Sequence, residues 1–517
     1  MLQKRLLFAW VLLCFVTAPF AQLNTDAAKY AGTITAAELK EKLSVIAGPE
    51  MEGRETASEG QRKAADYIAA YFKQLGLSPA NKGSYFQQFP VYQETIADAS
   101  LEINGKVANL FQDFGIIIGF TNGGEVKQSS VVFGGYGIYD SAQAFDDFKN
   151  ISVAGKLVVL LDGAPTTYKV PSAGNNRRTP PNPSMFAAKL AHLKKLGASA
   201  VLFVVQRGLP QKASLPLMGN KQFRKQANTA NLLAATIDIN TAKQLLQQPA
   251  AESLDALNEL PKKEYSANVE LKINKSVLPL ESSNVAGFIS GTDKKDEYVV
   301  LTAHYDHLGK RNGVIYYGAD DDGSGTTSVL QMAKAFAEAK KAGKGPRRTV
   351  VFMTVSGEEN GLWGSQYYSE NPLFPLDKTT VNLNTDMVGR VDPGYKGDTS
   401  NYVYVIGDDK ISSDLAVITD SVNQTSKMEL DRRFNDLNDP NRFYYRSDHY
   451  NFAKAGVPII FYFNGVHADY HQPTDTVDKI NFSLMEKRVK FIFNTAWAMA
   501  NRNDFLKRDK PLQIPPR

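Results

Sequence analysis

The sequence has almost no cysteine. The only one among its 517 residues is Cys14, which lies in an apolar run near the N-terminus. A chain without other thiols has no cysteine nucleophile to use, and any metal site in it must be built from histidines and carboxylates. Histidines are also scarce, six in all, so where they fall in the sequence is informative.

Long apolar runs and dense tracts of one charge are absent too. The first apolar run, residues 6–16, is shorter than the ~20 residues that a membrane span needs, and no later run reaches that length. The net charge is +5 without any Lys/Arg-rich tract, so we expect neither a nucleic-acid surface nor a membrane span. Hydrophobic and charged contents of 43% and 22% are typical of a folded, soluble protein, and the length predicts two or three domains.

The N-terminus has the pattern of a secretory signal peptide. Lys4 and Arg5 precede the apolar run, and a short stretch ending in the small residue Ala21 follows it. We therefore predict that residues 1–21 are a leader cleaved after Ala21, with Cys14 as apolar filler. The mature protein is expected to be exported, to a periplasm or to the medium.

The pattern of apolar and polar residues changes twice along the chain. Residues 22–107 contain helical patterns, and short β-rich runs then dominate a predicted α+β insert at residues 108–272. In residues 273–503 continuous apolar runs alternate with amphipathic helices, and a polar tail follows at 504–517. Apolar strands alternating with helices predict an α/β fold, with a mixed, mainly parallel sheet and helices on both faces.

Four of the apolar runs end in residues that could bind a metal. Such strand ends are where open α/β sheets collect their ligands. An acidic turn at residues 318–325 precedes a further helix, and five of the six histidines fall in this part of the chain, so unrelated surface residues are the weaker explanation. The residues at the strand ends are His304, Asp306 and His307; Glu358 and Glu359; Asp386; and His467 with His471.

These motifs resemble those of the co-catalytic zinc aminopeptidase family, which also includes the glutamate carboxypeptidase II group and the glutaminyl cyclases. The insert is similar to a protease-associated (PA) domain at residues 135–138, 153–156 and 195–198. The resemblance implies a zinc-peptidase (phosphorylase/hydrolase-like) fold and covers nearly all of the mature chain. It rests on residues 303–309, 318–325, 357–365, 384–387 and 469–471, and extends to 52–54 and 447–449.

The resemblance also implies two zinc ions per chain. It assigns His304 and Asp386 to one zinc, and Glu359 and His471 to the other. Asp321, in the middle of the acidic triplet, would bridge the two ions together with a water or hydroxide. Dinuclear sites need one carboxylate that reaches both ions, and zinc accepts imidazole and carboxylate ligands.

Three further residues are expected to take part in catalysis. Glu358 would be the general base, because consecutive glutamates diverge and one of them can face the water while Glu359 holds metal. Asp306 would orient His304, and Tyr470 would stabilise the oxyanion. Asp320 and Asp322 are expected to be structural neighbours, as is His192 in the insert. The remaining histidines, His307, His449 and His467, are placed outside the ligand set.

The leading functional hypothesis is an exported aminopeptidase that acts on peptides with a free N-terminus. A carboxypeptidase of the glutamate carboxypeptidase II type stays open, because Arg390, Arg442 or Arg446 could hold a substrate carboxylate. A glutaminyl cyclase, which uses one zinc, and a non-enzymatic receptor are disfavoured by the complete set of ligands and base. The preferred side chain, the role of the PA-like insert and the oligomeric state are left open by the sequence.

Overall fold

The computed structural model divides the chain into two compact units. Unit 1 is formed by the chain up to Phe89 and from Glu281 onwards, and unit 2 by Pro90–Leu280. Strands β2 (Phe86–Ile103) and β12 (Glu264–Ile289) run from one unit into the other. The structure describes residues 18–116, 118–169, 184–206, 222–224 and 232–512.

The structure bears on the predicted leader and on the predicted insert. The predicted leader lies outside the described residues except for its last four positions, which begin helix α1 (Ala18–Ala31). The predicted insert at 108–272 lies within unit 2, and its likeness to a PA domain stays a prediction.

Unit 1 contains a sheet with the strand order β19-β18-β20-β17-β13-β16-β12. Parallel pairs join β16 to β13, β13 to β17, and β17 to β20, whereas β12 and β18 run antiparallel to β16 and β20. The predicted mixed, mainly parallel sheet is thus confirmed. Its strands are β13 (Lys294–His304), β16 (Arg348–Val355), β17 (Thr379–Thr385), β18 (Tyr402–Ile406), β19 (Glu429–Asp431) and β20 (Ile459–Phe463).

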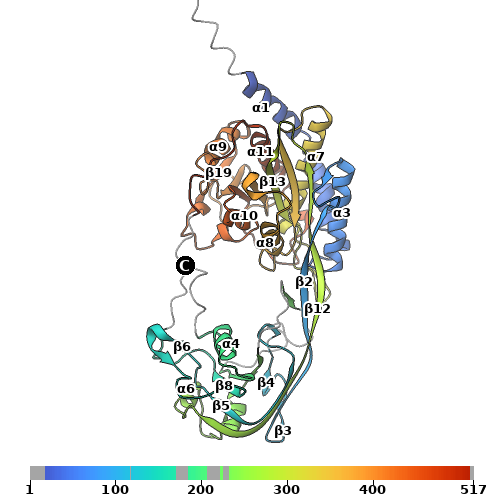
Figure 1. Cartoon of the computed structure of the whole chain (residues 1–517). Helices are drawn as coiled ribbons and strands as arrows, with labels where there is room; N and C mark the ends of the chain where they lie inside the picture. Colours follow the sequence, from blue (N-terminus) through green and yellow to red (C-terminus); the bar gives the residue numbers. More distant parts are fainter. Residues whose placement is uncertain (1–17, 117, 170–183, 207–221, 225–231, 513–517) are drawn as a thin grey trace, which may run out of the picture. The chain divides into compact units, whose positions relative to one another are not determined.

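Both faces of this sheet are buried, which explains its continuous apolar runs. In β13, Val299 and Leu301 belong to one core cluster and Val300 to the other. Figure 1 shows α7 (Gly325–Lys341) and α11 (Phe482–Asn501) beside β13, and both contact it. With them, α1, α2 (Ala36–Ile46) and α3 (Glu59–Leu75) line the first cluster, while α8 (Trp363–Glu370) and α10 (His449–Lys454) line the second. Helix α9 (Leu415–Ser426) packs on α11.

Unit 2 has its own sheet and core. Its strand order is β12-β5-β8-β9-β11-β4, with parallel pairs from β5 to β11. His192 on α4 stacks on Tyr139 with ring centroids 4.6 Å apart, which suits the structural role expected for it. The elements are β4 (Phe114–Gly115), β5 (Gly124–Phe133), β8 (Leu157–Leu161), β9 (Ala200–Val204), β11 (Leu233–Ile237), α4 (Phe186–Lys195), α5 (Ile239–Leu245) and α6 (Leu254–Asn258).

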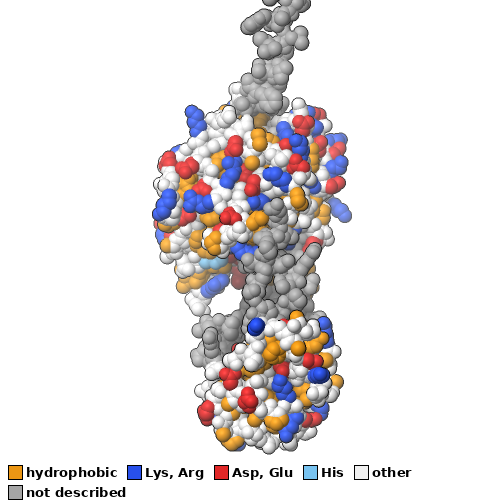
Figure 2. All heavy atoms as spheres, turned by 90° about the vertical axis from the view of Figure 1, so that its left-hand side faces the viewer, with side chains coloured by type: hydrophobic (Ala, Val, Ile, Leu, Met, Phe, Trp, Pro, Cys, Tyr) orange, Lys and Arg blue, Asp and Glu red, His pale blue; other side chains and the backbone are white. Residues whose placement is uncertain are grey.

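The other strands of the described chain are short. They are β1 (Ser78–Pro79), β3 (Lys106–Val107), β6 (Tyr139–Asp140), β7 (Phe145–Asp146), β10 (Gln222–Arg224), β14 (Lys310–Arg311) and β15 (Val314–Ile315). Figure 2 shows Lys and Arg interspersed with Asp and Glu on the face turned to the viewer. Within the described ranges, none of the helices has both the length and the apolar composition that crossing a membrane requires.

Candidate metal centre

The register of three neighbouring strands brings the first site residues to one edge of the sheet. His304, the last residue of β13, lies opposite Val355, the last residue of β16. Thr302 lies opposite Asn384 of β17, so Asp386, two residues further on, ends level with His304. The carboxyl ends of parallel strands therefore meet here, as expected for the ligand-binding edge of an α/β sheet.

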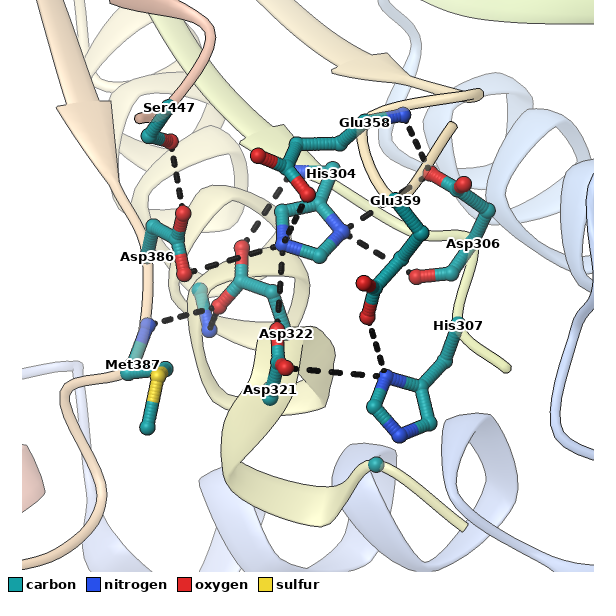
Figure 3. A network of polar contacts seen from close by, with 12 residues as sticks. His304, Asp306, His307, Asp321, Asp322, Glu358, Glu359, Asp386, Met387 and Ser447 are labelled. Carbon is teal, nitrogen blue, oxygen red and sulfur yellow. Dashed lines mark hydrogen bonds and ion pairs between the residues drawn. The ribbon is translucent and has the colours of Figure 1, made fainter. Parts of the chain in front are cut away.

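The first group of donor atoms consists of His304, Asp321 and Asp386. The Nε2 atom of His304 lies 3.3 Å from Oδ1 of Asp321 and 3.6 Å from Oδ1 of Asp386. One donor atom from each of the three residues lies within 4.8 Å of the others, and all three residues are buried. Figure 3 shows the three side chains directed toward one another.

The second group shares Asp321 with the first. Its Oδ2 atom lies 3.1 Å from Nε2 of His471, and Oε2 of Glu359 lies 3.0 Å from the same nitrogen. Asp321 thus directs one carboxylate oxygen toward His304 and the other toward His471. The five residues predicted as metal ligands are brought together, with Asp321 between the other two pairs.

His307 also belongs to the second group, although it was predicted to lie outside the ligand set. Its Nδ1 atom lies 2.8 Å from Oε1 of Glu359 and 3.8 Å from Oδ2 of Asp321. The alternation of side chains along a strand could not predict the position of His307, because β13 ends at His304. Beyond that point the chain pairs differently, and His307 forms a β-bridge with Glu55. The available signal was its position, three residues after a ligand.

The donor atoms fit a metal ion better than they fit one another. The atoms of the second group lie only 2.8 to 3.8 Å apart. Yet four of them are buried without a hydrogen bond of acceptable geometry to any described residue: His307 Nδ1, Asp321 Oδ2, Glu359 Oε1 and His471 Nε2. Buried polar atoms without partners are costly, and a cation among them would remove that cost. Imidazole nitrogens and carboxylate oxygens in a buried site are the ligands that zinc accepts.

The two consecutive glutamates differ in the direction of their side chains and in the direction of their pKa shifts. Figure 3 shows Glu358 directed toward His304 and Asp386, and Glu359 directed toward His307. Burial raises the pKa of Glu358 well above its usual value, and neighbouring carboxylates add to this. Burial and Asp321 also raise the pKa of Glu359, but the imidazoles of His307 and His471 outweigh them and lower it. Glu359 is therefore suited to hold a cation, and Glu358 to hold and pass on a proton.

The shared carboxylate and its imidazole partners shift each other's pKa. Burial raises the pKa of Asp321, but contacts with His304 and His471 outweigh it and lower that pKa well below its usual range. Partial burial lowers the pKa of His471, while Asp321 and Glu359 raise it to about 10. The two groups of donor atoms thus interact strongly with one another even before any ion is bound.

Asp306 connects His304 to Glu358. Its main-chain carbonyl oxygen lies 3.1 Å from Nδ1 of His304, whereas its carboxylate Oδ1 is 3.7 Å from that nitrogen. The carboxylate instead accepts the N–H of Glu358 at 3.2 Å and the hydroxyl of Thr56 at 2.8 Å. Asp306 therefore fixes His304 chiefly through its main chain, and Glu358 through its side chain.

The outer acidic residues of the triplet hold the turn in place. Asp322 accepts the N–H groups of His304 and Met387 at 3.2 and 3.0 Å, and burial raises its pKa well above the usual value. Asp475 accepts the N–H groups of Asp320 and Asp321 at 3.0 and 3.1 Å. The turn that carries Asp321 is thus tied to β13, to the residue after Asp386 and to the segment that follows His471.

The two remaining histidines of unit 1 have partners outside the donor groups. His467 places Nε2 at 3.1 Å from Oδ2 of Asp320, so it supports the acidic turn. His449 places Nε2 at 2.7 Å from the carbonyl oxygen of Tyr444, and burial lowers its pKa to about 3. A further supporting residue, Ser447, donates its hydroxyl to Oδ2 of Asp386 at 2.6 Å.

Arg54 supports the site from the N-terminal segment. It is fully buried and donates hydrogen bonds to the carbonyl oxygens of Ile46, Tyr305, Tyr317 and Gly318, at 2.7 to 2.9 Å. Three of these carbonyls flank either His304 or the acidic turn. One side chain thereby joins the segment between α2 and α3 to the metal centre.

A pocket opens beside the first donor group, and we call it the site pocket. It encloses about 360 Å³, part of which is open to solvent. Tyr470, predicted to stabilise an oxyanion, lines it and stacks on His471 with ring centroids 3.9 Å apart. The lining residues are Asp321, Glu358, Asp386, Met387, Phe443, Arg446, Ser447, Phe461, Phe463, Val466 and Tyr470.

Fold and site together define an α/β protein with a histidine–carboxylate candidate metal centre at the carboxyl edge of its sheet. Residues 284–496 match the sequence model of peptidase family M28, which confirms the resemblance and makes this part of the chain a member of that family. The solved aminopeptidase from Aneurinibacillus sp. strain AM-1 shares the fold. It aligns with a TM-score of 0.54 at 18% identity, over 95% of this chain and 100% of that one.

Curated relatives are similar over part of the chain. A probable leucine aminopeptidase of Arthroderma otae is 29% identical over 216 residues, which is 41% of this chain and 56% of the relative. A probable zinc metalloprotease of Pyrenophora teres f. teres is 25% identical over 308 residues, which is 52% of this chain and 62% of the relative. The chain therefore spans less than two thirds of the length of these relatives.

We expect Arg54→Met to lower the free energy of unfolding of unit 1 by at least about 3 kcal/mol, because it leaves several buried carbonyls without a donor. Urea denaturation of the metal-free protein can be followed by tryptophan fluorescence, since the only tryptophans after the predicted leader, Trp363 and Trp497, lie in unit 1. The matched control is Arg62→Met, whose exposed side chain pairs with Glu59 and should change stability by less than about 0.5 kcal/mol. Equal midpoints for the two variants would contradict the role given to Arg54.

Proposed function

We propose that this chain is an exported zinc-dependent aminopeptidase that hydrolyses the first peptide bond of substrates with a free N-terminus. The observation that carries the proposal is the placement of Asp321, which offers one oxygen to each of two donor groups with Glu358 at their side. Membership of the M28 peptidase family and the name of the leucine aminopeptidase relative support the choice of reaction. Export rests on the leader pattern of residues 1–21.

The donor groups suggest how two zinc ions would be divided among the ligands. His304 and Asp386 would hold one ion, Glu359 and His471 the other, and Asp321 would bind both. Glu359 has its Oε2 on the side of His471 and its Oε1 on the side of His307. In this proposal His307 therefore orients the carboxylate of Glu359 through the oxygen that does not face His471.

The protein's own residues then handle the proton and the developing negative charge. When bound, zinc would supply Lewis-acid polarisation of the scissile carbonyl and a lowered pKa for a water molecule. Glu358 takes a proton on its carboxylate and passes it to the leaving amine, a task that its raised pKa favours. Burial and nearby carboxylates raise the pKa of Tyr470, so its phenol stays protonated and donates to the oxyanion.

The alternatives differ in specific residues. Of the three arginines considered for a carboxypeptidase, Arg390 pairs with Asp469 at 2.8 Å and with Asp475 at 3.8 Å, which leaves it engaged. Only Arg446 lines the site pocket. In a one-zinc cyclase, one of the two donor groups would bind no ion. The presence of both groups therefore favours the two-zinc hydrolase.

We expect a chromophoric leucine anilide to be cleaved at least 100-fold faster than its N-acetyl counterpart. The free α-amine is the group that distinguishes the two substrates, so the ratio of their kcat/KM values measures its recognition. A chelator should abolish the activity and added zinc should restore it. Faster cleavage of blocked peptides with a free C-terminus would instead identify a carboxypeptidase.

The role of Glu358 is tested by Glu358→Gln. We expect kcat to fall by about 10²- to 10⁴-fold because the proton acceptor is lost, while the zinc content of the protein stays unchanged. The matched control is Glu338→Gln near the C-terminal end of α7, whose partly exposed side chain belongs to neither donor group and pairs with Lys334 at 3.7 Å. A Glu358→Gln variant that keeps more than a tenth of the turnover would remove Glu358 from its role.

A further inference from the structure

The lining of the site pocket contains both carboxylates and apolar side chains. The carboxylates are Asp321, Glu358 and Asp386, and Figure 3 shows the last two close to His304. The apolar side chains are Met387, Phe443, Phe461, Phe463 and Val466. The single cation of the lining is Arg446, and its side chain is exposed to the pocket.

Arg446 has only weak partners within the described part of the chain. Its Nη2 atom donates to the hydroxyl of Tyr470 at 3.3 Å, and its Cζ atom lies 5.1 Å from the centre of the Phe443 ring. No carboxylate of a described residue lies within ion-pair distance of it. The ring and the hydroxyl hold the planar group in place but leave most of its five N–H donors free for a ligand.

Other arginines near the site behave differently. Arg390 is largely buried and forms ion pairs with Asp469 and Asp475. Arg54 donates hydrogen bonds to main-chain carbonyls. Arg446 is exposed to the pocket and has no such commitment. Arg446 therefore differs from these two arginines in having neither a carboxylate nor a set of main-chain carbonyls as its partner among the described residues.

We propose that Arg446 binds a carboxylate of the substrate in the site pocket. The planar fork of a guanidinium matches a carboxylate in two parallel hydrogen bonds, and apolar lining residues such as Phe443 lower the dielectric around them. The inference rests on the proposed function, because two zinc ions would balance the charge of Asp321, Glu358, Glu359 and Asp386. The positive charge of Arg446 is then the one left without a counter-charge in the pocket.

The carboxylate can come from two parts of a peptide. One is an acidic side chain at the N-terminus, and the other is the C-terminal carboxylate of a dipeptide. Both present the same group to Arg446, and they are distinguished by matched substrates: a glutamyl anilide against a glutaminyl anilide, and Leu-Gly against Leu-Gly-amide. Each pair differs chiefly in one carboxylate, so the ratio of kcat/KM within a pair isolates its recognition.

The test compares the full-length wild type with Arg446→Gln and Arg446→Lys. In one of the two pairs, we expect Arg446→Gln to lower kcat/KM for the carboxylate substrate by about 10- to 100-fold, mainly through KM, because a charged hydrogen bond is lost. The uncharged member of that pair should change by less than about threefold. Arg446→Lys, which keeps the charge without the fork, should recover part of the loss.

Two results would overturn the proposal. Equal losses for both members of each pair would show that Arg446 only positions Tyr470, and unchanged ratios in both pairs would show that it binds no substrate carboxylate. Because each ratio is internal to one protein sample, partial misfolding of a variant lowers both members alike and does not imitate selectivity.

Failure of the proposed function would look different. If N-acetyl-Leu-Gly is cleaved faster than Leu-Gly-amide and the cleavage depends on Arg446, the chain is a carboxypeptidase and the role of Arg446 stands. If no substrate is cleaved, calorimetric titration of the zinc-loaded protein with glutarate and with its uncharged diamide replaces kinetics. Tighter binding of glutarate that Arg446→Gln abolishes supports the proposal, and equal binding of the two probes refutes it.

Discussion

The carboxylate of Asp321 is the constraint on which the site depends. Its two oxygens face two different imidazoles, at 3.3 Å for His304 and 3.1 Å for His471, so this one side chain must be fixed in both position and rotation. The burial of a carboxylate is unfavourable unless cations or donors compensate it. Here the compensation comes from histidines on either side, and in the proposed function the same arrangement would offer an oxygen to each of two metal ions.

Much of unit 1 can be understood as the support for that carboxylate. Asp475 holds the main chain of Asp321 from the segment after His471, and Asp322 ties the turn to the ends of β13 and β17. Arg54 closes the arrangement from the N-terminal segment by binding the carbonyl of Tyr305, next to His304, and that of Gly318, at the start of the turn. Residues far apart in the sequence are thereby made interdependent, and the burial of all of them makes any loss costly.

Sequence patterns predicted the sheet because its strands are buried on both faces and read as unbroken apolar runs. They also placed four of the five ligand candidates at one edge, since strand ends can be recognised without knowing the packing, whereas the role of Asp321 in the acidic turn came from the family resemblance. Other features depend on contacts that have no local signature. His307 lies past the end of β13, where alternation stops applying, and Arg54 and Ser447 act through partners far away in the sequence. The free donors of Arg446 could be recognised only from its own contacts in the folded chain, which are the Tyr470 hydroxyl and the Phe443 ring.

The measurement that tests this account most directly is anomalous diffraction at the zinc edge from crystals of the zinc-loaded protein. The account predicts two peaks about 3.5–4 Å apart, each within about 2.0–2.2 Å of a different oxygen of Asp321. It further predicts Nε2 of His471, rather than Nδ1 of His307, as the imidazole ligand of the second ion. A single peak, or two peaks of which only one touches Asp321, would contradict it.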